Sequence, residues 1–254
     1  MKDSGFRARL MSGEPLAGTF MKTPVVDVLE VLILAGLDFV CLDAEHAPFD
    51  RAALNTLCAV ARAARFPVLV RVPSGSAEQI GMTLDAGADG IVVPHVTDAA
   101  TAARVARAAR FGPGGRGYAG STRWAAFGTS AMPDLLSASR ETLVVAQIED
   151  PEAVEAADAI AQTDGIDALF LGPADLTVGY GHDSQANEDV SRAYAHVGEA
   201  ARGAKKPFLT FVPDTDRARE LHAAYGVTGF FIASEHAWML QGARQAVSGI
   251  RDLR

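Results

Sequence analysis

The fold is decided by Leu143-Val144-Val145-Ala146-Gln147-Ile148-Glu149 and Ala168-Leu169-Phe170-Leu171-Gly172-Pro173-Ala174-Asp175, two short apolar runs that each end in a carboxylate. An alanine-rich, helix-like stretch separates them. In a strand–helix–strand unit the two strands lie parallel and close together, so Glu149 and Asp175 are expected at the same edge of the sheet. Two converging carboxylates form the oxygen-rich pocket that Mg²⁺ or Mn²⁺ prefers. The alternative is that each carboxylate only caps the helix that follows it.

The same alternation of apolar runs and amphipathic stretches continues along the whole chain. The predicted strands are Ala17–Met21, Phe39–Leu42, Pro67–Arg71, Gly90–Pro94, Leu143–Ile148, Ala168–Leu171, Pro207–Phe211 and Gly229–Ile232. Helix-like segments lie between and after them, near 24–35, 50–65, 76–86, 98–110, 151–162, 186–203, 214–225 and 235–252. Helix starts are indicated by capping residues, namely Asp50, Ser76, Asp98 and Asp214.

Eight strand-plus-helix units predict an α/β protein with a (β/α)8 TIM barrel, and residues 1–254 are read as a single domain. The apolar runs do not alternate cleanly with polar residues, as is typical of parallel strands that are buried on both faces. A doubly wound open sheet is the main rival, but no Gly-x-Gly-x-x-Gly opens the first helix. One connection, from Phe111 to Ser139, is unusually long, and loops of that length are usually functional or disordered.

Composition restricts the class of protein. The chain has 254 residues, of which 49% are hydrophobic, and its formal net charge is −8. An acidic balance argues against a general nucleic-acid binder, since phosphate binding needs a basic face. No apolar run approaches the roughly 20 residues that a membrane helix needs, and the N-terminus lacks the apolar segment of a secretory signal. The two cysteines, Cys41 and Cys58, lie in apolar surroundings, which is typical of buried free thiols in a cytoplasmic protein.

In a barrel, the chemistry sits where strands end and helices begin. The polar residues near those positions are Asp43, Glu45, His46, Arg71, Asp85, His95, Gln147, Glu149 and Asp175. Arg71 ends an apolar strand, and an arginine fork there suits a carboxylate or enolate oxygen. His46 has carboxylate neighbours that would orient it as a general base. By pattern alone Asp85 reads as a structural helix-face carboxylate, and His95 shows no metal-ligand spacing.

The lysines argue against an imine mechanism. Only Lys2, Lys22, Lys205 and Lys206 are present, and a Schiff-base enzyme needs a lysine inside the barrel. Lys205 and Lys206 precede the seventh strand, at the wrong face. Lys22 ends the first strand and is the sole candidate, so a metal-assisted route is favoured.

These residues resemble a known family. Asp43-Ala-Glu-His46-Ala-Pro, Arg71-Val-Pro, Asp85-Ala-Gly-Ala, Arg116-Gly, Gln147-Ile-Glu149 and Gly172-Pro-Ala-Asp175-Leu are similar to the motifs of the HpcH/HpaI aldolases. That family of class II pyruvate aldolases includes 4-hydroxy-2-oxoheptanedioate aldolase and 2-dehydro-3-deoxyglucarate aldolase. The resemblance runs from about Gly18 to Thr177. It implies a (β/α)8 barrel, a divalent metal ion (Mg²⁺, Mn²⁺ or Co²⁺) and a homohexamer. The implied reaction is the reversible cleavage of 4-hydroxy-2-oxo acids to pyruvate and an aldehyde through a metal-stabilised pyruvate enolate.

Carried over to this sequence, the resemblance implies that Glu149 and Asp175 bind the metal and that Gln147 lines its site. Arg71 would hold the pyruvate keto oxygen. His46 would be the acid/base, acting through a metal-bound water and oriented by Asp43 and Asp85. The backbone at Gly172 and Ala174 would hold the pyruvate carboxylate. Lys22 and the run Ile232-Ala-Ser-Glu235-His236-Ala-Trp238 depart from the family pattern at the mouth, which leaves the aldehyde partner open.

Other functions fit parts of the pattern. A metal-dependent lyase or decarboxylase acting on another 2-oxo acid, such as oxaloacetate, would use the same enolate. A barrel that binds metal and oxo acid without turnover would have no need of both His46 and Arg71. A citrate-lyase-like coenzyme A enzyme would need a cationic surface, which the acidic balance does not favour.

The final helix-like segment carries an apolar stripe. Its members are Ala237, Trp238, Leu240, Ala243, Val247, Ile250 and Leu253, at three- and four-residue spacing. By pattern alone this stripe would pack on its own barrel. The resemblance instead implies packing of residues 235–254 on a neighbouring subunit, with Trp238 as a large anchor.

Overall fold

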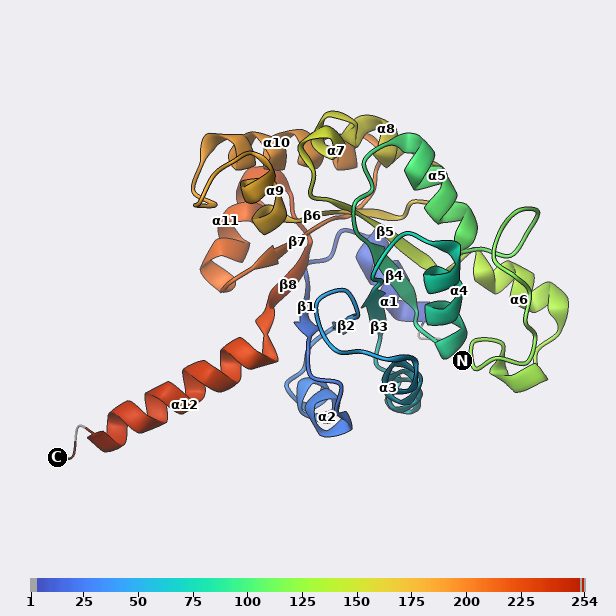
Figure 1. Ribbon diagram of the computed structural model, residues 1–254, viewed down its shortest axis with the longest axis horizontal. Coiled ribbons are helices and arrows are strands. Elements are labelled where there is room, and N and C mark those ends of the chain that lie inside the picture. The colour runs from blue at the N-terminus through green and yellow to red at the C-terminus, as the bar shows by residue number, and fades with distance from the viewer. Residues whose placement is uncertain (1–3, 252, 254) are drawn as a thin grey trace.

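The computed structural model describes residues 4–251 and 253, and eight parallel strands close into a barrel in chain order (Figure 1). The first and last strands pair through Leu16 and Gly229, which closes the sheet. The strands are β1 (Leu16–Met21), β2 (Phe39–Asp43), β3 (Val68–Arg71), β4 (Gly90–Val93), β5 (Leu143–Ile148), β6 (Ala168–Leu171), β7 (Phe208–Val212) and β8 (Gly229–Ser234). The predicted barrel and all eight predicted strands are confirmed, with ends that differ by no more than two residues.

The amphipathic stretches form helices as predicted, and all of these helices except the last surround the barrel. They are α2 (Val26–Leu34), α3 (Arg51–Ala64), α4 (Ala77–Ala86), α5 (Ala99–Ala108), α7 (Pro151–Glu155), α8 (Ala157–Gln162), α10 (Glu188–Gly203), α11 (Thr215–Tyr225) and α12 (Glu235–Arg251). The side chains of Asp50, Ser76, Asp98 and Asp214 each accept a backbone N–H of the first turn, as expected of N-caps.

Three short helices and a 3₁₀ turn were not predicted. They are α1 (Ser4–Met11), α6 (Met132–Ser139), α9 (Pro173–Gly179) and η1 (Ala126–Gly128). The predicted helix 151–162 is two helices that meet at Ala156. The long segment 111–139 therefore carries structure of its own, and it packs around Trp124 and Leu135.

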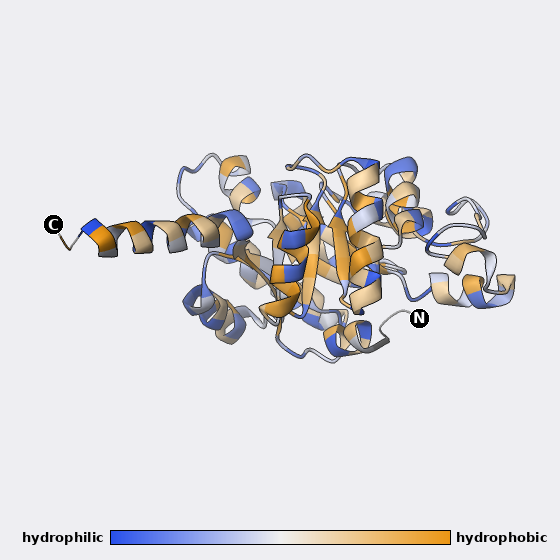
Figure 2. Cartoon of the chain, turned by 90° about the horizontal axis from the view of Figure 1, so that it is seen from below, coloured by the Kyte–Doolittle hydropathy of each residue, from blue (hydrophilic) through white to orange (hydrophobic). Residues whose placement is uncertain are grey.

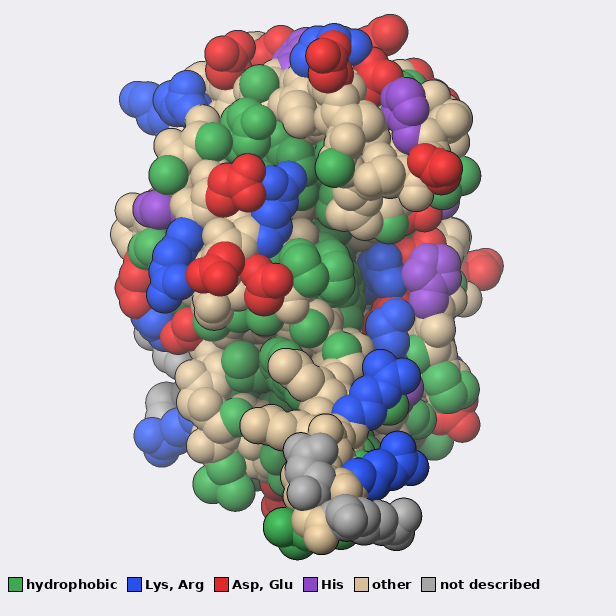
Figure 3. Space-filling view, turned by 90° about the vertical axis from the view of Figure 1, so that its left-hand side faces the viewer, with side chains coloured by type: hydrophobic (Ala, Val, Ile, Leu, Met, Phe, Trp, Pro, Cys, Tyr) green, Lys and Arg blue, Asp and Glu red, His purple; other side chains and the backbone are tan. Residues whose placement is uncertain are grey.

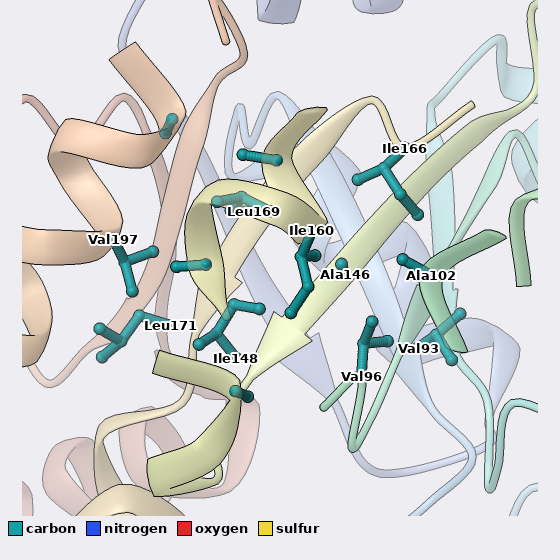
Figure 4. Packing of buried hydrophobic residues seen from close by; sticks show 14 of the residues in the cluster. Val93, Val96, Ala102, Ala146, Ile148, Ile160, Ile166, Leu169, Leu171 and Val197 are labelled. Carbon is teal, nitrogen blue, oxygen red and sulfur yellow. The ribbon is translucent and has the colours of Figure 1, made fainter. Parts of the chain in front are cut away.

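The core has two layers because parallel strands in a barrel bury both faces. Inside the barrel, the aromatic rings of Phe20, Phe39, Phe170 and Phe231 contact one another. Outside it, aliphatic side chains of β4, β5 and β6 pack against α5, α8 and α10 (Figure 4). In the hydropathy view the strands are the most hydrophobic part of the chain (Figure 2). Gly18 leaves room for one of the interior rings, since a Cβ there would lie 2.4 Å from Phe39.

The last helix stands away from the barrel. Figures 1 and 2 show α12 projecting from the end of β8, and Figure 3 shows hydrophobic side chains at the surface on that side. Trp238 packs against the cluster of buried hydrophobic side chains that includes Met21 and Leu29, whereas Met239, Leu240 and Ile250 are more than half exposed. The expectation from pattern alone, that the stripe covers its own barrel, is wrong for the described residues of the helix after Trp238. Residues 252 and 254 of the predicted C-terminal segment lie outside the described residues.

Candidate active site at the barrel mouth

A cleft of about 380 Å³ opens at the carboxyl ends of the strands. Of the residues that the sequence selected, it is lined by Lys22, His46, Arg71, Gln147, Gly172, Ala174 and Asp175. Its walls are otherwise largely apolar, with Phe20 and Phe211 among them. Polar groups that converge in a mostly apolar cleft are typical of a small-molecule site, and the mouth is where barrel enzymes place their chemistry.

Arg71 is held rigidly at the end of β3. Its Nε and Nη2 donate to the two carboxylate oxygens of Asp43 at 3.0 and 2.8 Å, and its Nε lies 3.2 Å from Glu45 Oε2. The guanidinium also lies over the Phe20 ring, 4.4 Å from its centroid. Burial alone would raise the pKa of Asp43, but hydrogen bonds from Arg71 outweigh burial and lower it. The site therefore presents a fixed positive charge whose partner carboxylate stays ionised.

Glu149 is a buried carboxylate at the end of β5. Its Oε1 accepts the His95 backbone N–H at 2.9 Å, and its Oε2 accepts from Gln147 Nε2. Burial raises the pKa of Glu149, and the negative charge of Asp175 raises it further. Gly172 makes the close packing possible, because a Cβ there would lie 2.9 Å from Glu149 Cβ. The structure thus packs Glu149 against Gly172, which immediately precedes the helix that carries Asp175, as their strand-end positions predicted.

The donor set around Glu149 fits a divalent cation. Gln147 Oε1 is buried and accepts no hydrogen bond from the described residues, so it offers a free carbonyl-type oxygen. Gln147 and Asp175 both line the cleft, and Asp175 lies in the first turn of α9, directly after the close contact at Gly172. Carboxylate and amide oxygens are ligands that hard divalent cations prefer. These residues therefore match the chemistry of a Mg²⁺ or Mn²⁺ site.

His46 lies in the turn after β2. Its backbone N–H donates to Asp43 Oδ1 at 3.2 Å, and its Nε2 lies 3.7 Å from Glu45 Oε2. The imidazole is half exposed at the cleft, where it can reach a bound ligand. Asp43 thus positions His46 through its backbone, and Glu45 is the carboxylate that approaches its ring.

The structure does not bring Asp85 to His46 within the chain. Asp85 is near the end of α4, which leads into the start of β4, so it lies at the end of the barrel opposite the mouth. Its carboxylate pairs with the buried guanidinium of Arg116, which lies over the rings of Phe111 and Trp124. The direction of α4 explains the difference, because every helix of a (β/α)8 barrel runs back to the opposite face.

His95 is a site residue that the sequence reasoning set aside. It follows β4 with a left-handed backbone (φ 53°), and its Nδ1 lies 3.0 Å from Asp150 Oδ2 and 3.5 Å from Glu149 Oε1. Metal-ligand spacing in sequence could not reveal it, because its neighbours come from another strand end. The strand-end position that selected Glu149 applies equally to His95 and was the available signal.

Hydrogen bonds at the mouth connect the end of β1 with the start of α12, through Lys22, Glu235 and His236. Glu235 Oε1 accepts the backbone N–H groups of Lys22 and Thr23 at 2.8 and 2.6 Å, and His236 Nε2 lies 2.7 Å from Thr23 Oγ1. Lys22 Nζ lies 3.5 Å from Asp43 Oδ2. Glu235 is therefore a structural tie between β1 and the start of α12.

Comparison with known proteins places this site in a family. Residues 17–235 match the model of the HpcH/HpaI aldolase/citrate lyase family. The chain is 33% identical to a hydroxypyruvate/pyruvate aldolase of Paraburkholderia phytofirmans, with 96% of each chain covered. It is 34% identical to a 5-keto-4-deoxy-D-glucarate aldolase of an Enterobacter species, over 91% of this chain and 90% of the relative.

A solved structure agrees with this. The HpcH/HpaI aldolase/citrate lyase family protein from Burkholderia cenocepacia superposes with a TM-score of 0.91 at 34% identity, covering 97% of this chain and 99% of that one. The predicted fold and the carbon–carbon lyase class are confirmed by these likenesses. From its barrel, its strand-end carboxylates and its likeness over almost its full length, this chain belongs to the HpcH/HpaI aldolase/citrate lyase family.

Proposed function

We propose that the chain is a metal-dependent aldolase that cleaves 4-hydroxy-2-oxo acids to pyruvate and an aldehyde, and that also runs the reverse condensation. The observation that carries the proposal is one cleft lined by Asp175, the fixed guanidinium of Arg71 and the accessible imidazole of His46. Glu149 packs behind Gly172 in the wall of this cleft. Carbon–carbon cleavage next to a keto group needs stabilisation of an oxyanion and a proton carrier. Arg71 and His46 supply these two functions.

Glu149 and Asp175 would hold the divalent cation, with Gln147 Oε1 facing the same cleft. When bound, the cation supplies positive charge that lowers the cost of the enolate oxyanion. Mg²⁺, Mn²⁺ and Co²⁺ are the ions we propose. Mg²⁺ and Mn²⁺ prefer carboxylate and amide oxygens as ligands, so we rank them before Co²⁺ at this site.

The remaining residues act on the 2-oxo acid directly. Arg71, fixed by Asp43, holds the keto oxygen and stabilises the negative charge that develops on it. The N–H of Ala174 lies in the first turn of α9, where helical N–H groups lack an intrahelical partner, so it can bind the pyruvate carboxylate beside Gly172. His46 removes the proton of the C4 hydroxyl in cleavage and returns it in condensation.

The names of the relatives support the choice of substrates. One is named for hydroxypyruvate and pyruvate, and another for a keto-deoxy sugar acid. We therefore propose pyruvate or hydroxypyruvate as the nucleophile, and a small aldehyde as its partner.

One experiment tests the proposed function. The protein is incubated with pyruvate, Mn²⁺ and a panel of aldehydes, and new 4-hydroxy-2-oxo acids are identified by mass spectrometry. Asp175→Asn should abolish product formation, whereas the matched change Asp183→Asn, on an exposed loop, should not. A parallel assay supplies oxaloacetate. If the protein decarboxylates oxaloacetate and forms no aldol product, the proposed activity is wrong and the protein is a decarboxylase. If borohydride reduction attaches pyruvate to Lys22, the reaction proceeds through an imine and not through a metal ion.

We also propose that the protein is a homo-oligomer, with a hexamer as the first choice. The support is α12, whose described residues after Trp238 are all exposed although several are large and apolar. Burial of such side chains at about 25 cal/mol per Å² favours packing on a second copy.

The assignment of residues 1–254 to one domain and the location in the cytoplasm stay predictions. In the described part of the chain, no helix is long and apolar enough to cross a membrane.

A further inference from the structure

A second group of metal-ligating side chains lies beside the Glu149–Asp175 pair. Glu45, His95 and Glu149 follow β2, β4 and β5, and each offers one ligand atom within 4.8 Å of the other two. Asp175 is not part of this group. Three donors from three different strand ends, at distances that one ion can span, are the usual arrangement of a metal site in a barrel mouth.

The individual donors are available for an ion. Glu45 Oε2 is buried and accepts no hydrogen bond from the described residues, although Arg71 Nε lies 3.2 Å away. His95 Nδ1 lies 3.5 Å from Glu149 Oε1 and 3.0 Å from Asp150 Oδ2, so this ring nitrogen faces the carboxylates. An ion bound to Nδ1 would replace its contact with Asp150.

Electrostatics favour a cation at the same place. The side chains of Glu45 and Glu149 are only 13% and 2% exposed, so both carboxylates lie largely out of solvent. Keeping both ionised in one small volume is costly unless positive charge lies between them. Arg71 already lies against one oxygen of Glu45, so an ion here competes with that contact and is expected to bind less tightly than at Glu149 and Asp175.

We propose that Glu45, His95 and Glu149 form a second divalent-cation position that shares Glu149 with the first and takes ions that accept imidazole, such as Co²⁺, Mn²⁺ or Zn²⁺. An imidazole donor suits these ions, whereas Mg²⁺ prefers oxygen ligands and remains at the Glu149–Asp175 pair. The assignment goes beyond the proposed function, because it holds for any substrate of the cleft.

The test is a Co²⁺ titration of the full chain, followed by the visible absorption of Co²⁺ and by calorimetry. Because Co²⁺ also fits the Glu149–Asp175 pair, we expect two Co²⁺ per chain, of which only the more weakly bound one has nitrogen-coordinated absorption. His95→Asn keeps the left-handed backbone, which asparagine tolerates, and removes the imidazole. It should weaken Co²⁺ binding by about 10–100-fold or more. Glu45→Gln, on another element, should do the same.

The matched control is His182→Asn, since His182 lies on the loop after α9, is not one of the three donors and pairs with Asp189. Its Co²⁺ titration should match that of the wild type. The proposal is overturned if only one Co²⁺ binds per chain, or if His95→Asn titrates like the wild type while circular dichroism shows that it is folded. Neither result bears on the aldol assay, so failure here and failure of the proposed function are separable.

Discussion

Replacement of Arg71 should cost the protein both stability and activity, and the two losses can be separated. Asp43 is fully buried and depends on Arg71 for a two-point ion pair. Removing one partner of a buried ion pair leaves an uncompensated charge, which typically costs about 3–5 kcal/mol. Lys22 Nζ remains 3.5 Å from Asp43, so we expect Arg71→Met to fall near the lower end of that range. For a chain of this length, this corresponds to a fall of about 6–12 °C in Tm.

The assay combines thermal unfolding with aldol cleavage. Arg71→Met/Asp43→Asn leaves no orphaned carboxylate at position 43, so it should recover most of the stability, while cleavage stays lost because no guanidinium faces the enolate. Arg219→Met removes an exposed arginine and should change stability by no more than about 0.5 kcal/mol. The reasoning is refuted if Arg71→Met melts with the wild type. If the double variant is no more stable than the single one, the loss comes instead from packing of the guanidinium on Phe20.

Four further outcomes are expected. Chelation should abolish aldol activity, and Mn²⁺ or Mg²⁺ should restore it; full activity of the metal-free protein would remove the metal from the mechanism. His46→Ala should lower turnover by about 10²–10⁴-fold with metal affinity near wild type by calorimetry, and unchanged turnover would exclude His46 as the acid/base. Gly172→Ala should cost about 1–3 kcal/mol and weaken Mn²⁺ binding, because a Cβ would lie 3.1 Å from Glu149 Oε2. Gly203→Ala, with open space around it, should do neither, and equal Mn²⁺ affinities would contradict the steric argument. Deletion of residues 236–254 should lower the oligomeric order in light scattering, and a monomeric intact chain at micromolar concentration would rule out the proposed assembly.

The sequence alone was sufficient for the barrel. Short apolar runs, capping residues such as Asp98 and Asp214, and the regular spacing of strand and helix are local signals, and the structure confirms the elements that they predicted. The sequence missed α9 and α6, because each is short and begins beside a proline within a segment that reads as a loop. It also missed the break at Ala156, since a helix of continuous alanine-rich character gives no local sign of an interruption.

For the site as well, some features could be predicted from the sequence and others only from the structure. Position at a strand end is a property of the sequence, so Arg71, Gln147, Glu149 and Asp175 were predicted to converge. Arg71, Gln147 and Asp175 line one cleft, and Glu149 packs against Gly172 in its wall. Which side chains face one another across different strands is not a local property. Only the tertiary structure shows that His95 meets Glu149 and that Asp85 lies at the far end of the barrel with Arg116. The apolar stripe of α12 was likewise visible in the sequence, but its exposure depends on where β8 directs the helix. Local periodicity fixes which elements form, whereas the packing of the closed barrel decides which residues meet.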